Sequence, residues 1–297
     1  MSGGPRIAVI GIPGKWSTEV LADALEDKTG FRLVLDMAAV SVNFETNTLT
    51  GGGQDLCQLD GIIVKKISQV YSPNALDRLE LLRIAEARGV RIFSPAETML
   101  RMIDRLACTT TLRKGGIPMP PTVATENTPD ALAAIKRFGA AVFKPLYSTK
   151  ARGMCVIEAG RPDSLIQADI DAFKAENPMM YIQQKIDLPG RDFGMVFLGG
   201  RYLGSYARVA QSETWNTTIN SGGKYAPHDP PQSTIDLAAK AERLFGMDFT
   251  TVDVADTADG PIVFEVSAFG GFQGAKDGIG IDAATLYADY AIKEVSS

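Results

Sequence analysis

The stretch TVDVADTADGPIVFEV, residues 251–266, contains two apolar runs, and each run carries one carboxylate. Asp253 lies in the run 251–254 and Glu265 in the run 262–266, with turn-forming residues between them. Such runs predict neighbouring buried strands, and if the strands pair, both side chains can reach the same face. The alternative is that the two carboxylates point to opposite faces of the sheet and are solvated.

Two carboxylates on one face would repel each other. At a separation of ~4 Å and an effective dielectric constant of ~20, the repulsion is about 4 kcal/mol. A shared proton, an arginine or a divalent cation has to offset this energy. With one histidine, His228, and three dispersed cysteines, zinc sites and histidine-dependent catalytic pairs are disfavoured. A metal here is therefore expected to be bound by oxygen atoms, as Mg²⁺ is, and the thiols of Cys57, Cys108 and Cys155 are expected to be buried.

Length and composition exclude several classes of protein. The chain has 297 residues, of which 45% are hydrophobic and 22% charged, so we expect a globular protein of about two units rather than a disordered or fibrous one. The apolar runs are shorter than the ~18 residues of a membrane-spanning helix, and the N-terminus lacks a signal-peptide layout. The net charge is −5 and the basic residues are dispersed, which argues against nucleic-acid binding. We therefore expect a cytoplasmic protein that binds neither membrane nor nucleic acid.

The order of the apolar runs predicts a mixed fold, partly α/β and partly α+β. Residues 1–95 alternate strands and helices and predict an open α/β layer. One helix is expected over residues 96–114, ending at Gly115-Gly116. Residues 96–180 predict a small central α+β unit, and residues 181–297 a strand-rich C-terminal α+β unit. No repeat or low-complexity tract interrupts this layout.

A phosphate-binding loop is predicted at YSTKARG, residues 147–153. No GxxxxGK[ST] string is present, and Gly11-x-x-Gly14 lacks the third glycine of a dinucleotide fingerprint. A plain hairpin linker does not need two cations and two hydroxyls, whereas a loop closing over phosphates uses them. The candidate residues are Ser148, Thr149, Lys150, Arg152 and Gly153, together with Lys144, which is otherwise read as an exposed strand end.

In this order the motifs resemble the ATP-grasp carboxylate–amine ligases, closest to the RimK-like group that adds amino acids such as glutamate to acceptor ends. The resemblance covers about residues 90–295 and is carried by these segments: DRL (104–106), GIPMP (116–120), VFKP (142–145), STKARG (148–153), YIQQKI (181–186), GRDF (190–193), YAR (206–208), VDV (252–254), EVSA (265–268) and GIGID (278–282). It is specific as an ensemble and weak motif by motif.

The resemblance implies the ATP-grasp fold, which clamps ATP between two α+β subdomains, and it implies roles for individual residues. Arg105 and Lys144 would contact phosphates, and Arg208 would face the transferring phosphoryl group, so Arg208 and Lys144 are the catalytic candidates. Asp253, Glu265 and Ser267 would bind Mg²⁺ or Mn²⁺. The remaining ATP-binding candidates are the adenine-edge residues Gln183, Gln184, Lys185 and Ile186, and Asp192 near the ribose.

Four positions depart from the family's pattern. Ser267 stands where the third metal ligand is an asparagine, and Thr218 where an asparagine is common. Gly194 stands where glutamate ligases often carry an arginine, and residues 269–271 (FGG) replace SPG. These departures concern the substrate and metal side of the site. They motivate the alternative of a degenerate ATP-grasp protein that binds nucleotide without ligase activity.

The activity that the resemblance implies is ATP-dependent amide-bond formation through an acylphosphate, with a glutamate-like amino acid added to a protein, peptide or coenzyme acceptor. A small metabolite as acceptor is an alternative, and a plain Rossmann-type binding domain is disfavoured by the missing glycines. Family relatives also suggest a homo-oligomer, although the sequence shows no interface signature. The ends of parallel strands bind ligands in open α/β layers, so Lys15 and Trp16 after the first strand and Lys65 after the third are substrate candidates. The resemblance adds Thr218 and the flanking Asn216 as further substrate candidates. A solvated lysine and a core tryptophan are the alternative reading of the first three.

Overall fold

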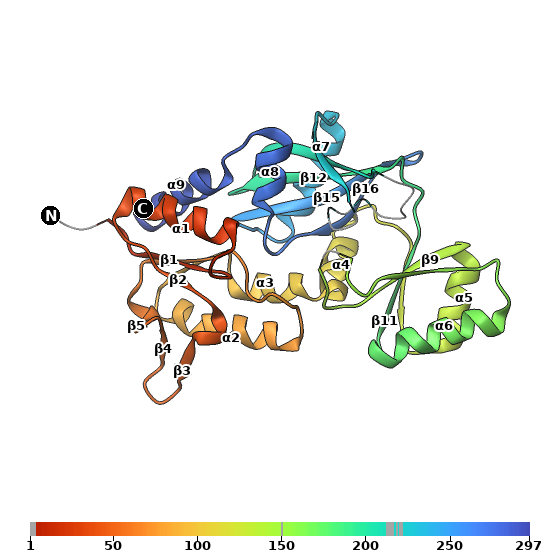
Figure 1. The fold of residues 1–297 in the computed structure, drawn as a ribbon, viewed down its shortest axis with the longest axis horizontal. Coiled ribbons are helices and arrows are strands. Elements are labelled where there is room, and N and C mark those ends of the chain that lie inside the picture. Colours follow the sequence, from red (N-terminus) through yellow and green to blue (C-terminus); the bar gives the residue numbers. More distant parts are fainter. Residues whose placement is uncertain (1–3, 150, 212–216, 218, 220–221) are drawn as a thin grey trace.

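The structure, a computed structural model, describes residues 4–149, 151–211, 217, 219 and 222–297 (Figure 1). Within this part of the chain no helix is both long and apolar enough to cross a membrane. Three groups of strands and helices follow one another along the chain.

The N-terminal unit is a parallel sheet in the order β2-β1-β6-β7. Strand β1 has all four residues buried, as expected for a parallel sheet covered on both faces. One face packs on α1 and on the last helix of the chain, and the other face packs on α2. A small antiparallel sheet, β3-β4-β5, is attached to it. The elements are β1 (Ile7–Ile10), α1 (Trp16–Thr29), β2 (Val34–Leu35), η1 (Met37–Ala39), β3 (Ser41–Asn43), β4 (Thr48–Gly51), β5 (Gln54–Asp55), η2 (Leu56–Gln58), β6 (Gly61–Val64), α2 (Pro73–Ala87) and β7 (Arg91–Phe93).

The helix expected over residues 96–114 is two helices, α3 (Ala96–Ile103) and α4 (Arg105–Lys114). Asp104 separates them because its backbone is extended, with φ −77° and ψ 112°, and its carboxylate accepts a hydrogen bond from the amide of Leu106. It thus caps α4 at its N-terminus. The apolar residues of α3 and α4 belong to the core shared by the N- and C-terminal units. The break makes Arg105 the first residue of a new helix.

The central unit is a four-stranded antiparallel sheet, β10-β9-β11-β8, with α5 and α6 packed on it. It has a hydrophobic core of its own, and in Figure 1 it stands apart from the rest of the molecule. Its elements are β8 (Thr122–Thr125), α5 (Thr128–Phe138), β9 (Ala140–Lys144), β10 (Cys155–Glu158), α6 (Asp163–Glu176) and β11 (Met180–Gln184). Strand β11 comes last along the chain and lies between β9 and β8 in the sheet. The sequence placed the end of the central unit at residue 180, the first residue of this strand.

The C-terminal unit is a five-stranded antiparallel sheet, β14-β13-β12-β15-β16. Helix α7 packs on one side of it, and α8 packs against β13 and β14 on the other side. Helix α9 returns to α1, so the first and last helices of the chain pack side by side (Figure 1). The elements are β12 (Arg191–Leu198), β13 (Arg201–Val209), β14 (Lys224–His228), α7 (Gln232–Arg243), β15 (Phe249–Thr257), β16 (Gly260–Val266), α8 (Phe272–Ile279) and α9 (Ala283–Val295).

The cysteines and the histidine have structural surroundings. Cys57 and Cys108 are buried free thiols, as expected, whereas Cys155 is only half-buried because it lies on the edge strand β10. His228 stacks on Phe193 with ring centres 3.6 Å apart. None of the four side chains is paired with another as a metal or catalytic site.

Candidate functional site

Asp253 and Glu265 stand directly opposite each other on β15 and β16. Residues that face each other across an antiparallel pair project from the same side of the sheet. The alternative in which the two carboxylates point to opposite faces therefore does not hold. The side chain of Asp253 is 15% exposed and that of Glu265 is 41% exposed, so the pair runs from the interior of the site to its rim.

Arg208 compensates the inner carboxylate. It pairs with Asp192 across β12 and β13 through two hydrogen bonds, and its Nη2 also lies 3.1 Å from Oδ2 of Asp253. The Thr217 hydroxyl donates to Asp192 at 2.6 Å, which holds this carboxylate in place. Burial raises the pKa of Asp253 to about 7, Arg208 opposes the rise, and Glu265 and Asp192 add to it. The other oxygen of Asp253, Oδ1, is buried and has no hydrogen-bond partner.

Arg105 compensates the outer carboxylate. Its Nη1 lies 2.9 Å from Oε2 of Glu265, and its side chain is only 10% exposed. The same guanidinium donates from Nε to the Pro145 carbonyl at 3.2 Å, and Nη2 lies 3.4 Å from Oγ of Ser148. Arg105 therefore links a strand of the C-terminal unit to the segment that follows β9 in the central unit.

Lys144 ends β9 and supplies the third cation. Its Nζ donates to Oε1 of Gln183 on the neighbouring strand β11, and it lies over the ring of Phe264. The pKa of Lys144 is lowered to about 7, chiefly by burial and also by the nearby Arg105, while Glu265 and Asp253 act in the opposite direction. The ammonium is thus ready to gain stability from any anion that enters the site.

Taken together, the site holds three carboxylates and three basic side chains, from Asp192, Asp253, Glu265, Arg105, Lys144 and Arg208. Its formal charge is close to balance before a ligand enters. Among the described residues no group of three or more His, Cys, Asp or Glu side chains converges as a metal site. A cation would accordingly rely on the facing pair Asp253 and Glu265 and on neighbouring neutral oxygens.

Ser267, the third candidate metal ligand, lies two residues beyond Glu265, where β16 has ended. Its amide donates to the Thr251 carbonyl at 2.9 Å, and its own carbonyl accepts from the Thr250 hydroxyl at 2.6 Å. Both backbone contacts fix the residue beside β15, while its side chain is shorter than the asparagine of the resemblance.

The candidate phosphate loop closes the hairpin between β9 and β10. The Arg152 amide donates to the Thr149 carbonyl, and Gly153 adopts φ +69°, a conformation that favours glycine. The Ser148 hydroxyl contacts the Pro145 carbonyl at 3.4 Å. Lys150 lies outside the described residues.

The adenine candidates occupy the end of β11 and the residues after it. Gln183 is 1% exposed and is held by Lys144, Thr122 and Tyr181. The amides of Gln184 and Lys185 donate to the carbonyls of Pro121 and Ala140. The amides of Gln184 and Lys185 are thus engaged within the fold.

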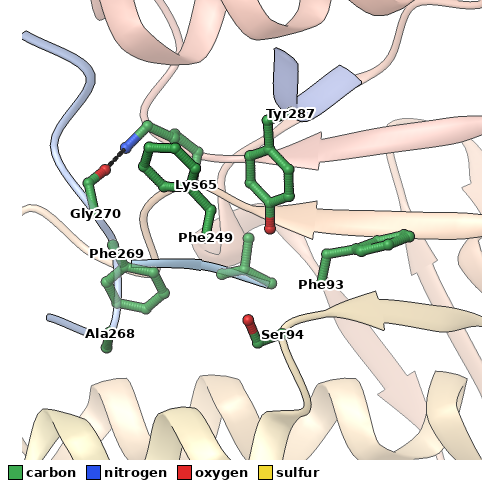
Figure 2. Close-up of a pocket in the computed structure, with 9 residues that line it drawn as sticks. Lys65, Phe93, Ser94, Phe249, Ala268, Phe269, Gly270 and Tyr287 are labelled. Carbon is green, nitrogen blue, oxygen red and sulfur yellow. Dashed lines mark hydrogen bonds between the residues drawn. The ribbon is translucent and has the colours of Figure 1, made fainter. Parts of the chain in front are cut away.

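The substrate candidates do not share one environment. Lys15 precedes α1 and is exposed, and Trp16, 38% exposed, packs under the ammonium of Lys276 on α8. Lys65 is buried and donates to the Gly270 carbonyl at 2.7 Å (Figure 2). Its ammonium also lies over the Phe272 ring. The adjoining pocket has a volume of about 10 Å³, room for about one water molecule. Lys65 thus supports the loop after Ser267. Asn216 and Thr218 lie outside the described residues.

The register explains one departure from the resemblance. Gly194 on β12 stands between Tyr206 on β13 and Asp253 on β15. A Cβ atom at Gly194 would lie 2.4 Å from the Tyr206 ring. On α8, a Cβ atom at Gly274 would lie 2.2 Å from the same ring, and one at Gly278 would lie 2.4 Å from the Cβ atom of Tyr206. The ring therefore occupies the volume into which an arginine at position 194 would project. The motif YAR (206–208) contains Tyr206, but the sequence predicted no role for this ring. The signal was its position two residues before Arg208, on the same face of the strand.

Known proteins resemble this chain over most of its length. A family model described as the RimK-like ATP-grasp domain matches residues 102–291, more than half of the chain. The tetrahydromethanopterin:alpha-L-glutamate ligase of Methanosarcina acetivorans is 26% identical, over 94% of this chain and 95% of that protein. The ribosomal protein bS6–L-glutamate ligase of Salmonella paratyphi B is 25% identical, over 94% of this chain and 93% of that protein.

Solved structures share the fold over nearly the whole chain. The ATP-grasp ligase PsnB, complexed with a phosphomimetic variant of its minimal precursor, Mg and ADP, superposes with a TM-score of 0.76 at 18% identity and covers 99% of this chain and 100% of that one. The D-cycloserine synthetase DcsG has a TM-score of 0.71 at 18% identity, covering 97% and 99%. The family model and the named relatives thus define the class as ATP-grasp ligases, enzymes that form C–N bonds. Within that class, the chain belongs to the RimK-like ATP-grasp family.

The contact at Gly194 leads to a prediction about stability. Gly194→Ala should destabilise the protein by about 1–3 kcal/mol, because the methyl group overpacks the Tyr206 ring. Chemical denaturation would measure the loss. Gly160→Ala is the control, since a Cβ atom there meets no atom within 4 Å. A Gly194→Ala protein as stable as the control would show that the ring can move aside freely.

Proposed function

We propose that this enzyme uses ATP to phosphorylate a carboxylate and then joins the acyl group to an amine, adding a glutamate-like amino acid to a protein, peptide or coenzyme acceptor. The named relatives support this substrate class, because they are glutamate ligases of a pterin coenzyme and of a ribosomal protein. The observation that carries the proposal is the facing pair Asp253 and Glu265, surrounded by Arg105, Lys144 and Arg208.

The donor set fits Mg²⁺. Hard divalent cations prefer carboxylate oxygens, and the buried Oδ1 of Asp253 lacks any partner. We therefore assign Asp253 and Glu265 as the metal ligands, with Ser267 contributing directly or through water, and we expect Mn²⁺ to replace Mg²⁺. These carboxylates would hold a bound cation, which would supply positive charge to neutralise the phosphates.

The basic side chains then have distinct tasks. Lys144 and Arg105 hold the phosphates, and Arg208, fixed by Asp192, meets the charge that develops on the transferring phosphoryl group. Ser148, Thr149, Lys150, Arg152 and Gly153 form the loop over the phosphates. Gln183, Gln184, Lys185 and Ile186 border the base, and Asp192 lies on the ribose side.

A carboxylate does not condense with an amine unaided, because its oxygen is a poor leaving group. Transfer of the γ-phosphoryl group gives an acylphosphate, the amine attacks its carbonyl carbon, and inorganic phosphate leaves. Water would hydrolyse this intermediate, so the loop at residues 148–153 is expected to exclude it. Lys15 and Trp16 are proposed to contact the acceptor, with Lys65, Asn216 and Thr218 bordering that side. We also propose a cytoplasmic location, where ATP is available.

A substrate screen tests the proposal as a whole. Purified enzyme with ATP and Mg²⁺ is supplied with each amino acid in combination with peptide, protein and coenzyme acceptors. Phosphate release and the mass of the acceptor are followed together. Release that depends on both substrates, with one amino-acid mass added per phosphate, is expected. Phosphate release without any mass increment in every combination would contradict ligation.

The metal assignment predicts the effect of Glu265→Ala. ATP turnover should fall by roughly 100-fold or more, because a charge that acts in the transition state is lost. The fold should remain intact, because this side chain is 41% exposed. Turnover and circular dichroism are measured side by side. Glu158→Ala, an exposed glutamate on β10, is the control, and wild-type turnover in the Glu265→Ala protein would refute the role.

Ser267→Asn tests the third ligand position. The longer amide side chain should tighten the apparent Mg²⁺ affinity by about fivefold, the equivalent of one polar contact of about 1 kcal/mol. A Mg²⁺ titration of activity measures the shift, with Ser267→Ala as the variant that shortens the side chain. If Ser267→Asn leaves the affinity unchanged or weakens it, residue 267 does not contact the metal.

A further inference from the structure

Arg105 connects two units that have separate hydrophobic cores. It begins α4, and its guanidinium contacts Glu265 on β16 of the C-terminal unit. Its Nε and Nη2 atoms contact Pro145 and Ser148 of the central unit, and its own amide donates to the Leu146 carbonyl at 3.3 Å. One buried side chain thus fixes the segment 145–148 relative to a proposed metal ligand.

These contacts depend on the shape of the guanidinium. Three different nitrogen atoms of Arg105 reach three different residues. A lysine ammonium is a single compact charge and cannot span the same partners, because its donors share one nitrogen atom. The arginine, where the resemblance implies a lysine, therefore gives this chain a link between the two units.

The two arginines of the site differ in what each keeps if the carboxylates bind a cation. Arg208 retains its two hydrogen bonds to Asp192 even if Asp253 turns away. Within the described part of the chain, Glu265 is the carboxylate that lies within ion-pair distance of Arg105. Loss of Glu265 thus removes the charged partner of Arg105 and leaves its neutral contacts to residues 145–148 and its place over the Tyr181 ring.

We propose that Arg105 is a positioning residue that couples cation binding at Glu265 to release of the segment 145–148 from the C-terminal unit. Without a cation, Arg105 neutralises Glu265 and holds this segment against the C-terminal unit. When Glu265 exchanges Arg105 for a divalent cation, the guanidinium becomes available to phosphate and the segment is released. This inference rests on the proposed metal site. It adds that Arg105 and the metal compete for Glu265, which goes beyond a contact between Arg105 and phosphate.

Metal binding to the nucleotide-free chain tests the competition. Free Mn²⁺ is measured by electron paramagnetic resonance during titration, without ATP or ADP. Arg105→Met should bind Mn²⁺ at least fivefold more tightly than wild type, because Glu265 has lost its competing cation. Arg101→Met, which removes an exposed ion pair with Glu97 on α3, is the control and should match wild type. Equal or weaker binding by Arg105→Met overturns the proposal.

Hydrogen exchange tests the coupling. In the wild type, Mn²⁺ alone should speed exchange of the Arg105 amide, which donates to the Leu146 carbonyl of this segment. In Arg105→Met and in Arg105→Lys, exchange there should already be fast and should not respond to Mn²⁺. A wild-type segment that ignores Mn²⁺ overturns the coupling.

Glu265→Gln separates this inference from the proposed function. If wild type and Glu265→Gln bind Mn²⁺–ADP equally well, the metal site itself is wrong. If Glu265→Gln loses Mn²⁺–ADP binding while Arg105→Met shows no gain in Mn²⁺ affinity, the metal site stands and the role of Arg105 fails.

Discussion

Asp253 and Glu265 face each other across two hydrogen-bonded strands, and their like charges must be compensated for this site to be stable. The register of β15 and β16 cannot slip by one residue without turning one carboxylate to the other face. Every basic side chain of the site is placed in relation to this pair. Arg208 reaches Asp253 from β13, and Arg105 reaches Glu265 from the start of α4.

The three units contribute to the site in different ways. The N- and C-terminal units share their hydrophobic cores and together support the two carboxylates. The central unit has its own core and places Lys144, Gln183 and the segment after β9 on the side of the two carboxylates. The contacts that Arg105 makes between the central and C-terminal units are polar. Exchanging them for contacts to a ligand would therefore expose little apolar surface. The N-terminal unit adds Lys65, which holds the loop following Ser267 (Figure 2).

Local patterns in the sequence predicted the mixed α/β and α+β fold and the two neighbouring strands that carry Asp253 and Glu265, because strand periodicity and isolated acidic residues are local features. They did not predict the break at Asp104. The helical pattern continues through this residue, and the break depends on the extended backbone of Asp104 and on its carboxylate capping α4. The ion pair of Arg105 and Glu265 joins residues 160 positions apart and depends on how two units dock. Tyr206 over Gly194 depends on strand register. Lys65 looked like an exposed ligand, yet the carbonyl of Gly270 closes over it.

The most direct measurement of the central claim is a crystal structure of the enzyme with ADP and Mn²⁺, with anomalous scattering used to locate the metal. The account predicts a Mn²⁺ peak bound to oxygen atoms of both Asp253 and Glu265 and to the nucleotide phosphates. An ordered nucleotide with Asp253 and Glu265 still paired to Arg208 and Arg105, and no metal between them, would contradict it.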